Sequence, residues 1–77
     1  MEVLFRNRGR KVKFRSETGL VQWMRKHDTE YTRNIFEFME VYKMRKLLFE
    51  KKTLSSSSPE DFVSDLIRNN IISVIRK

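Results

Sequence analysis

Apolar and polar side chains alternate along the first fifteen residues. Successive side chains of a β-strand point to opposite faces, so this alternation predicts two strands, over residues 2–6 and 10–15, that share one apolar face. The apolar members of the pattern are Val3, Phe5, Val12 and Phe14. Gly9 lies between the two strands and can adopt the positive φ of a tight turn, which predicts a β-hairpin. Because an isolated hairpin is barely stable in water, its apolar face is expected to pack on other elements.

Helical spacing replaces this alternation after Ser16. A short helix is predicted over about 17–27, with the side-chain oxygen of Ser16 as its N-cap. A longer helix is predicted over about 30–51, and its apolar stripe has helical periodicity. The stripe consists of Tyr31, Ile35, Phe38, Tyr42 and Phe49. Further apolar residues widen it beyond one stripe, and a helix of that kind is usually packed on more than one side.

The last quarter of the chain begins with a helix signal. Ser58, Pro59 and Glu60 supply a capping hydroxyl, a proline for the first turn and an acidic side chain for the positive end of the helix dipole. Residues 53–58, which include four consecutive serines, form the only linker-like segment. Residues 71–75 are rich in β-branched side chains and fit either an extension of this helix or a strand. We favour the strand, because the hairpin lacks a third one.

Together these elements predict a small α+β fold. We expect a single domain over residues 1–77, in which the N-terminal hairpin, joined by the C-terminal strand, packs on about three helices. A chain of 77 residues can bury one thin core. Its nine aromatic residues favour such a core, because each of their side chains can bury about 150–250 Å².

Positive charge is concentrated in the predicted hairpin. The chain has a net charge of +7, and residues 6–15 contain six basic side chains and no acidic one. These basic residues are Arg6, Arg8, Arg10, Lys11, Lys13 and Arg15. Guanidinium groups bind phosphate through paired hydrogen bonds, and a two-stranded ribbon fits the major groove of B-DNA. The pattern indicates a nucleic-acid surface, although basic residues on edge strands also serve to block aggregation.

A second basic segment covers residues 43–52. Lys43 and Lys46 could extend the cationic surface of the hairpin, so we include them among the candidate nucleic-acid-binding residues. The alternative is that cations gather near the C-terminus of a helix because they interact favourably with its dipole.

Residue types that enzymes and metal sites require are scarce. The chain has no cysteine, one histidine (His27) and two glycines. A zinc site needs three or four ligands, mostly cysteine or histidine, and a phosphate-cradling loop needs several glycines. Asp61 and Asp65 are one helical turn apart, which is more typical of an acidic helix N-terminus than of a magnesium site. We therefore expect no catalytic site, no metal and no cofactor.

Membrane segments are not expected either. The longest apolar run has three residues, which is far too short to span a bilayer, and the N-terminus lacks the apolar core of a signal peptide. The absence of cysteine fits a reducing compartment. These observations predict a soluble, cytoplasmic protein.

Two functional interpretations follow. The first is a small nucleic-acid-binding or nucleic-acid-process accessory protein that contacts mainly the phosphate backbone of DNA or RNA, with weak sequence specificity. The second is a protein-interaction module or regulator that docks on a larger, acidic enzyme through the long apolar helix, as a monomer or weak homodimer. Its candidate partner-binding residues are Phe36, Met39, Val41, Met44 and Leu48. A membrane-surface role ranks third, and an enzyme last.

Overall fold

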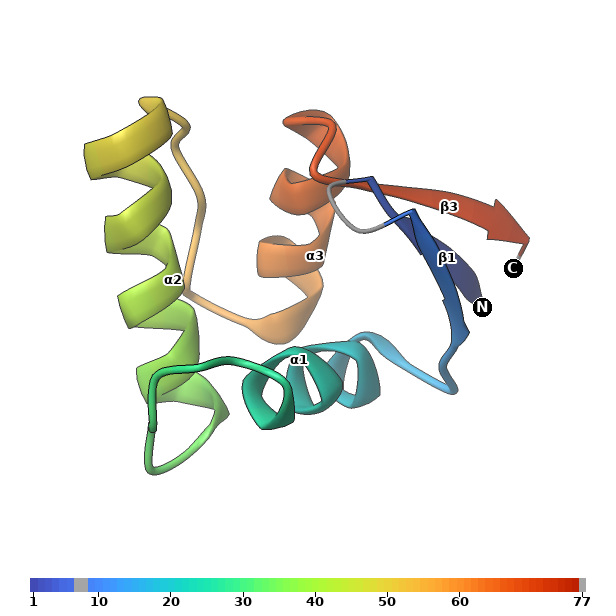
Figure 1. The fold of residues 1–77 in the computed structure, drawn as a ribbon, viewed down its shortest axis with the longest axis horizontal. Helices are drawn as coiled ribbons and strands as arrows, with labels where there is room; N and C mark the ends of the chain where they lie inside the picture. The colour runs from blue at the N-terminus through green and yellow to red at the C-terminus, as the bar shows by residue number, and fades with distance from the viewer. Residues whose placement is uncertain (7–8, 77) are drawn as a thin grey trace.

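The computed structural model describes residues 1–6 and 9–76 of the chain. Three strands and three helices follow one another in these residues, and Figure 1 shows their arrangement. They are β1 (Glu2–Phe5), β2 (Arg10–Lys13), α1 (Glu17–Lys26), α2 (Ile35–Glu50), α3 (Pro59–Arg68) and β3 (Ile72–Arg76). The predicted α+β fold is confirmed, and residues 72–76 form a strand.

The three strands form one antiparallel sheet in the order β2-β1-β3. The strand nearest the N-terminus is central, and the strand nearest the C-terminus pairs with it, so the two ends of the chain lie close together (Figure 1). Val3 is opposite both Val12 and Val74, and Phe5 is opposite both Arg10 and Ile72. Residues opposite each other point to the same side of a sheet, so this register defines an inner face that carries the valines.

The helices all lie on this inner face (Figure 1). α1 and α3 pack against each other, α3 also packs on β3, and α2 lies against α1 at the far side from the sheet. Aromatic rings join α2 to α3, with Tyr42 and Phe62 separated by 5.6 Å between ring centroids. The largest fully buried side chains are Phe38, Phe62, Leu20, Met39, Leu66, Ile72, Val3 and Val21. Met39 therefore belongs to the core, and its prediction as a surface residue for a partner is corrected.

The long helix begins at Ile35, five residues later than predicted. Asn34 caps it by accepting a hydrogen bond from the backbone N–H of Glu37 at 2.9 Å. The preceding loop is fixed from α1, because Arg25 donates to the carbonyl oxygen of Thr32 at 2.8 Å. Tyr31 falls in this loop and is exposed, so it does not belong to the helical stripe. Phe49, predicted in the same stripe, is also exposed.

The segment between α2 and α3 is irregular but ordered by specific contacts. Lys51 adopts a left-handed conformation (φ 56°) and ends α2. Leu54 is buried in the core, and the backbone N–H of Ser55 donates to the carboxylate of Asp65 at 2.8 Å. Ser58 then caps α3 by accepting from the backbone N–H of Asp61 at 3.1 Å. The predicted linker thus returns the chain along α2 to start α3.

Candidate nucleic-acid interface

The outer face of the sheet carries basic side chains. Lys11 is opposite Leu4 and Lys13 is opposite Glu2, so both lysines point away from the face that carries Val12. Arg6 reaches the same side, because its Nε donates to the Oγ of Ser73 on β3 at 2.9 Å. The helices lie on the other side of the sheet (Figure 1). Arg6, Lys11 and Lys13 therefore share one open surface, which we call the cationic face.

No carboxylate neutralises these cations among the residues that the structure describes. Arg6, Lys11 and Lys13 are exposed, and none of them forms an ion pair within 4 Å. Glu2 is the acidic residue nearest to them in the register, opposite Lys13. The cationic face is therefore open to an external anion. Arg15 lies just beyond β2, exposed and likewise unpaired, whereas Arg8 lies outside the described residues.

Arg10 occupies a different position from the one predicted. It is opposite Phe5 in the register and so belongs to the inner side of the sheet. Its guanidinium carbon lies 5.5 Å from the centroid of the Trp23 ring, in the geometry of a cation–π contact. The residue parity along β2, in which Arg10 and Val12 are two apart, already contains the signal for this position. Arg10 is thus at the rim of the aromatic cluster and not on the cationic face.

The second basic segment does not extend the cationic face. Lys46 pairs with Glu50 at 2.6 Å, and Lys43 donates to the Oγ of Ser56 at 3.2 Å and lies 3.5 Å from Glu40. Both lysines are on α2, which lies on the far side of the molecule from the outer face of the sheet (Figure 1). The structure therefore corrects the expectation that Lys43 and Lys46 continue the surface of the hairpin.

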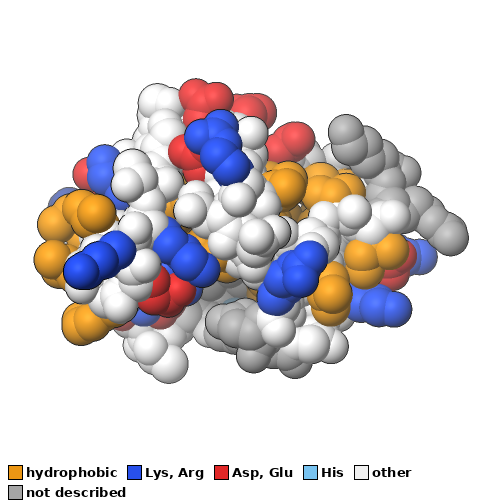
Figure 2. Space-filling view, turned by 90° about the horizontal axis from the view of Figure 1, so that it is seen from above, with side chains coloured by type: hydrophobic (Ala, Val, Ile, Leu, Met, Phe, Trp, Pro, Cys, Tyr) orange, Lys and Arg blue, Asp and Glu red, His pale blue; other side chains and the backbone are white. Residues whose placement is uncertain are grey.

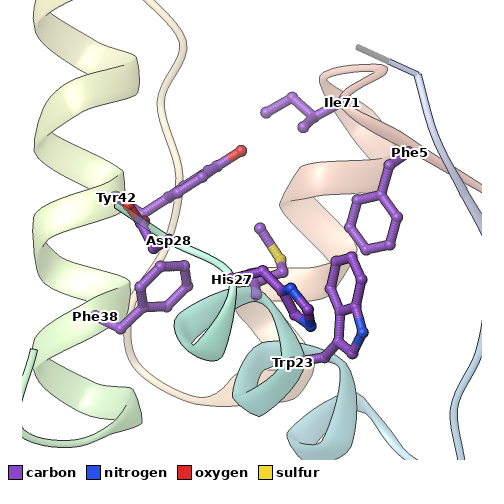
Figure 3. A pocket seen from close by; sticks show the side chains of 8 residues that line it. Phe5, Trp23, His27, Asp28, Phe38, Tyr42 and Ile71 are labelled. Carbon is purple, nitrogen blue, oxygen red and sulfur yellow. The ribbon is translucent and has the colours of Figure 1, made fainter. Parts of the chain in front are cut away.

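A small cavity lies between α1, α2 and the inner face of the sheet (Figure 3). Its volume is about 70 Å³. Its walls are Phe5, Trp23, Met24, His27, Asp28, Phe38, Tyr42 and Ile71. A cavity that encloses benzene measures about 150 Å³, so this one is too small to enclose an aromatic ring. It offers room for ordered water but not for a stacked base.

The polar side of this cavity is occupied by an ion pair. The carboxylate of Asp28 accepts hydrogen bonds from both terminal nitrogens of Arg45, one of them at 3.2 Å. Burial raises the pKa of Asp28, but the hydrogen bonds from Arg45 and from the backbone of Glu30 outweigh it and hold this pKa below its ordinary value. Asp28 is therefore a charged structural residue and a poor proton donor. His27, which caps the end of α1, packs on Trp23 with 4.3 Å between ring centroids and its ring tilted by 34°.

The residues predicted to bind a protein partner separate into two groups. Phe36, Met44 and Leu48 are exposed on α2, and Val41 is half-buried. Met39 points into the core instead. Leu47, which the sequence interpretation did not single out, is exposed beside them. The structure thus leaves an apolar surface on the side of α2 that faces away from the core.

Comparisons with protein-family models, with curated proteins and with solved structures found no match for this chain. Within residues 1–6 and 9–76, no helix is both long enough and apolar enough to cross a membrane. The same residues contain no group of three or more side chains of the metal-binding types placed to hold an ion.

Proposed function

We propose that this chain is a non-enzymatic, cytoplasmic protein that binds the phosphate backbone of nucleic acid through its cationic face. The observation that carries the proposal is the presence of three exposed, unpaired cations, Arg6, Lys11 and Lys13, on a sheet surface that no described helix covers. Arg15, two residues after Lys13, is exposed and adds a fourth positive charge. Lysine and arginine are the residues that neutralise phosphates and release their counterions.

The position of the aromatic side chains favours backbone contacts over base recognition. Proteins that bind single strands stack bases on exposed aromatic rings. Here Phe5, Phe14 and Trp23 pack against one another on the inner side of the sheet, with Phe5 and Trp23 stacked at 5.0 Å. The outer face offers Glu2, Leu4, Ser73 and the cations instead. Binding is therefore expected to depend on salt and only weakly on sequence.

Protection of sheet edges is a competing explanation for the basic residues. Lysines on an edge strand prevent pairing with another sheet, and Lys11 and Lys13 are on β2, which is an edge. Arg6, however, follows the central strand β1, where there is no edge to protect. Edge protection predicts that removal of the lysines causes aggregation. Backbone binding predicts that it weakens the affinity for nucleic acid.

A charge-matched pair of variants tests the proposal. One variant carries Lys11→Ala and Lys13→Ala, and the control carries Lys26→Ala and Arg68→Ala, which remove two exposed charges from the ends of α1 and α3. Fluorescence anisotropy with a short labelled duplex and a short single strand gives the affinity at several salt concentrations. For about four phosphate contacts, the affinity of the unmodified protein should fall about 100-fold between about 50 and 200 mM salt.

The two variants should differ in how strongly their affinity depends on salt. Loss of two phosphate contacts should reduce the slope of log K against log salt by about 2 in the Lys11/Lys13 variant, and the control should keep the slope of the unmodified protein. Equal slopes and affinities for all three proteins would overturn the proposal. So would a Lys11/Lys13 variant that precipitates but, while in solution, binds nucleic acid as well as the unmodified protein.

A further inference from the structure

The side of α2 that faces away from the core is apolar over most of its length. Phe36, Met44, Leu47 and Leu48 are 58 %, 47 %, 45 % and 67 % exposed. At 100° per residue these four side chains fall within a sector of about 120°, and they span about 18 Å along the axis. Figure 2 shows hydrophobic side chains at the left, which is the α2 end of the molecule. We call this surface the α2 face; it is distinct from the cationic face at the opposite end.

Charged residues flank the apolar centre of the α2 face, with the acidic ones at one end and a basic one at the other. Glu37 and Glu40 lie toward the start of the helix, and Lys51 lies at its end. At 100° per residue Glu37 and Glu40 fall in the same sector as the apolar side chains, and Lys51 is the left-handed residue that ends the helix. Glu37 pairs with Arg33. Glu40 lies 3.5 Å from Lys43, but its side chain is 59 % exposed and can still meet a second cation. Lys51 is exposed and pairs with no carboxylate among the described residues.

This order makes the α2 face complementary to itself in one orientation only. If two copies pack with their α2 helices antiparallel, a two-fold axis between Met44 and Leu47 sets Met44 against Leu47 of the second copy. The same register sets Glu40 against Lys51 of the second copy. A parallel arrangement would instead set acid against acid and lysine against lysine, which costs binding free energy. Two-fold symmetry with a self-complementary patch is the usual basis of homodimers.

We infer that the α2 face is the interface of an antiparallel homodimer of this chain. The face is about 18 Å long and about 10–12 Å wide, which is small beside the roughly 800 Å² per partner of a stable complex. The dimer is therefore weak and forms in a reversible equilibrium at micromolar or higher concentration. It does not depend on nucleic-acid binding, because the cationic face lies on the other side of the molecule (Figure 1).

Sedimentation equilibrium over a wide protein concentration range tests the dimer. Met44→Asp places a charge beside the two-fold axis, near the centre of the α2 face, and should weaken dimerisation at least about tenfold. Phe49→Asp is the matched control: Phe49 is also exposed and on α2, but it lies about 160° around the helix from the centre of the α2 face. The control should dimerise within about twofold of the unmodified protein. Circular dichroism checks that both variants are folded.

A charge exchange tests the antiparallel register. Lys51→Glu and Glu40→Lys should each abolish the homodimer, because each creates two like-charge contacts. A mixture of the two variants should dimerise again, since both contacts are then between opposite charges. A mixture that stays monomeric while the unmodified protein dimerises would overturn the antiparallel register. An unmodified protein that stays monomeric up to about 1 mM, or whose α2 face is covered by a different protein, would overturn the dimer itself.

Discussion

Single residues in this protein show how strongly strand parity decides the role of a charge. Arg10 and Lys11 are neighbours in the sequence, yet Arg10 lies over the Trp23 ring and Lys11 lies on the cationic face. Successive side chains of a strand point to opposite sides, so one position separates a structural contact from a candidate ligand contact.

Replacement of Arg10 should therefore destabilise the fold more than replacement of Lys11. Arg10→Ala removes an exposed cation–π contact and should lower the free energy of unfolding by about 0.5–1 kcal/mol. Lys11→Ala should change it by less than about 0.5 kcal/mol. Urea unfolding followed by the fluorescence of Trp23, the sole tryptophan, measures both values. Equal effects of the two substitutions would contradict the role assigned to Arg10.

The ion pair between Asp28 and Arg45 makes a pH-dependent contribution to stability. The pKa of Asp28 is held below its ordinary value of 3.8, and its side chain is only 9 % exposed. A lowered pKa means that the native state binds the proton more weakly than the unfolded chain does. The stabilisation is therefore complete above about pH 4–5 and is lost as the pH falls through the native pKa of Asp28.

Asp28→Asn should remove this contribution. At neutral pH we expect it to lower the free energy of unfolding by about 1–3 kcal/mol, because a nearly buried, charge-assisted hydrogen bond is lost. The difference between the two proteins should shrink as the pH falls below about 4, where the unfolded chain is protonated first, and should be lost at the native pKa of Asp28. Thermal unfolding between neutral and acidic pH follows the difference, and one that is constant over this range would show that the charge of Asp28 is not responsible.

Helices and strands are the scale at which the sequence was most informative. The hairpin, the cap of α1 by Ser16 and the cap of α3 by Ser58 all follow from local signals, since a hydroxyl before a helix binds a free backbone N–H. The start of α2 has a local signal of the same kind, Asn34 three residues before Glu37, which the predicted start near residue 30 overlooked. The loop before it could not be predicted, because it is held by Arg25 and by the pair of Asp28 with Arg45, whose partners are 17 residues apart.

The candidate site shows the same limit. The basic side chains of the hairpin could be placed from alternation alone, and the structure brings Arg6, Lys11 and Lys13 together. Neutralisation of Lys43 and Lys46 could not be foreseen in full, because Ser56, on the returning segment, approaches Lys43 only after folding. Burial of Met39 could not be predicted either. Apolar residues lie on several sides of α2, and tertiary packing decides which side faces the core.

The cap of α3 can be tested by comparing two serine-to-alanine substitutions, one at the cap and one within the same helix. Ser58→Ala removes the acceptor for the backbone N–H of Asp61 and should lower the free energy of unfolding by about 1 kcal/mol. Ser64→Ala, at an exposed position within α3, should be neutral or slightly stabilising, because alanine favours helices. Chemical denaturation of both variants measures the two values. A loss at Ser64 as large as that at Ser58 would mean that the hydroxyl of Ser58 does not act as a cap.

At the scale of the whole molecule, the sheet holds the two ends of the chain together. Ile72 is buried at the inner face opposite Phe5, whereas Ile75 is half-exposed in the same strand. A protein of this size has a small core and is only marginally stable, so the loss of one buried side chain removes a large share of its stability.

Ile72→Ala should therefore lower the free energy of unfolding by about 2–5 kcal/mol, which is a large share of the total. Ile75→Ala should cost less than about 1 kcal/mol, since much of that side chain stays in water in the folded state. Thermal melts of the two variants distinguish them. If the two melting temperatures coincided, β3 would not be part of the core that the structure describes.

The pairing of β1 with β3 also has a consequence for biosynthesis. β1 leaves the ribosome before β3, which follows it about 70 positions later. Until β3 has emerged, the backbone N–H and C=O groups on one edge of β1 have no strand to pair with, and the apolar side chain of Phe5 is not yet packed against Ile72. The sheet is completed only after the three helices between β1 and β3 have also emerged. Synthesis on the ribosome thus leaves a period in which chaperones or proteases reach the same strand that later lies at the centre of the sheet.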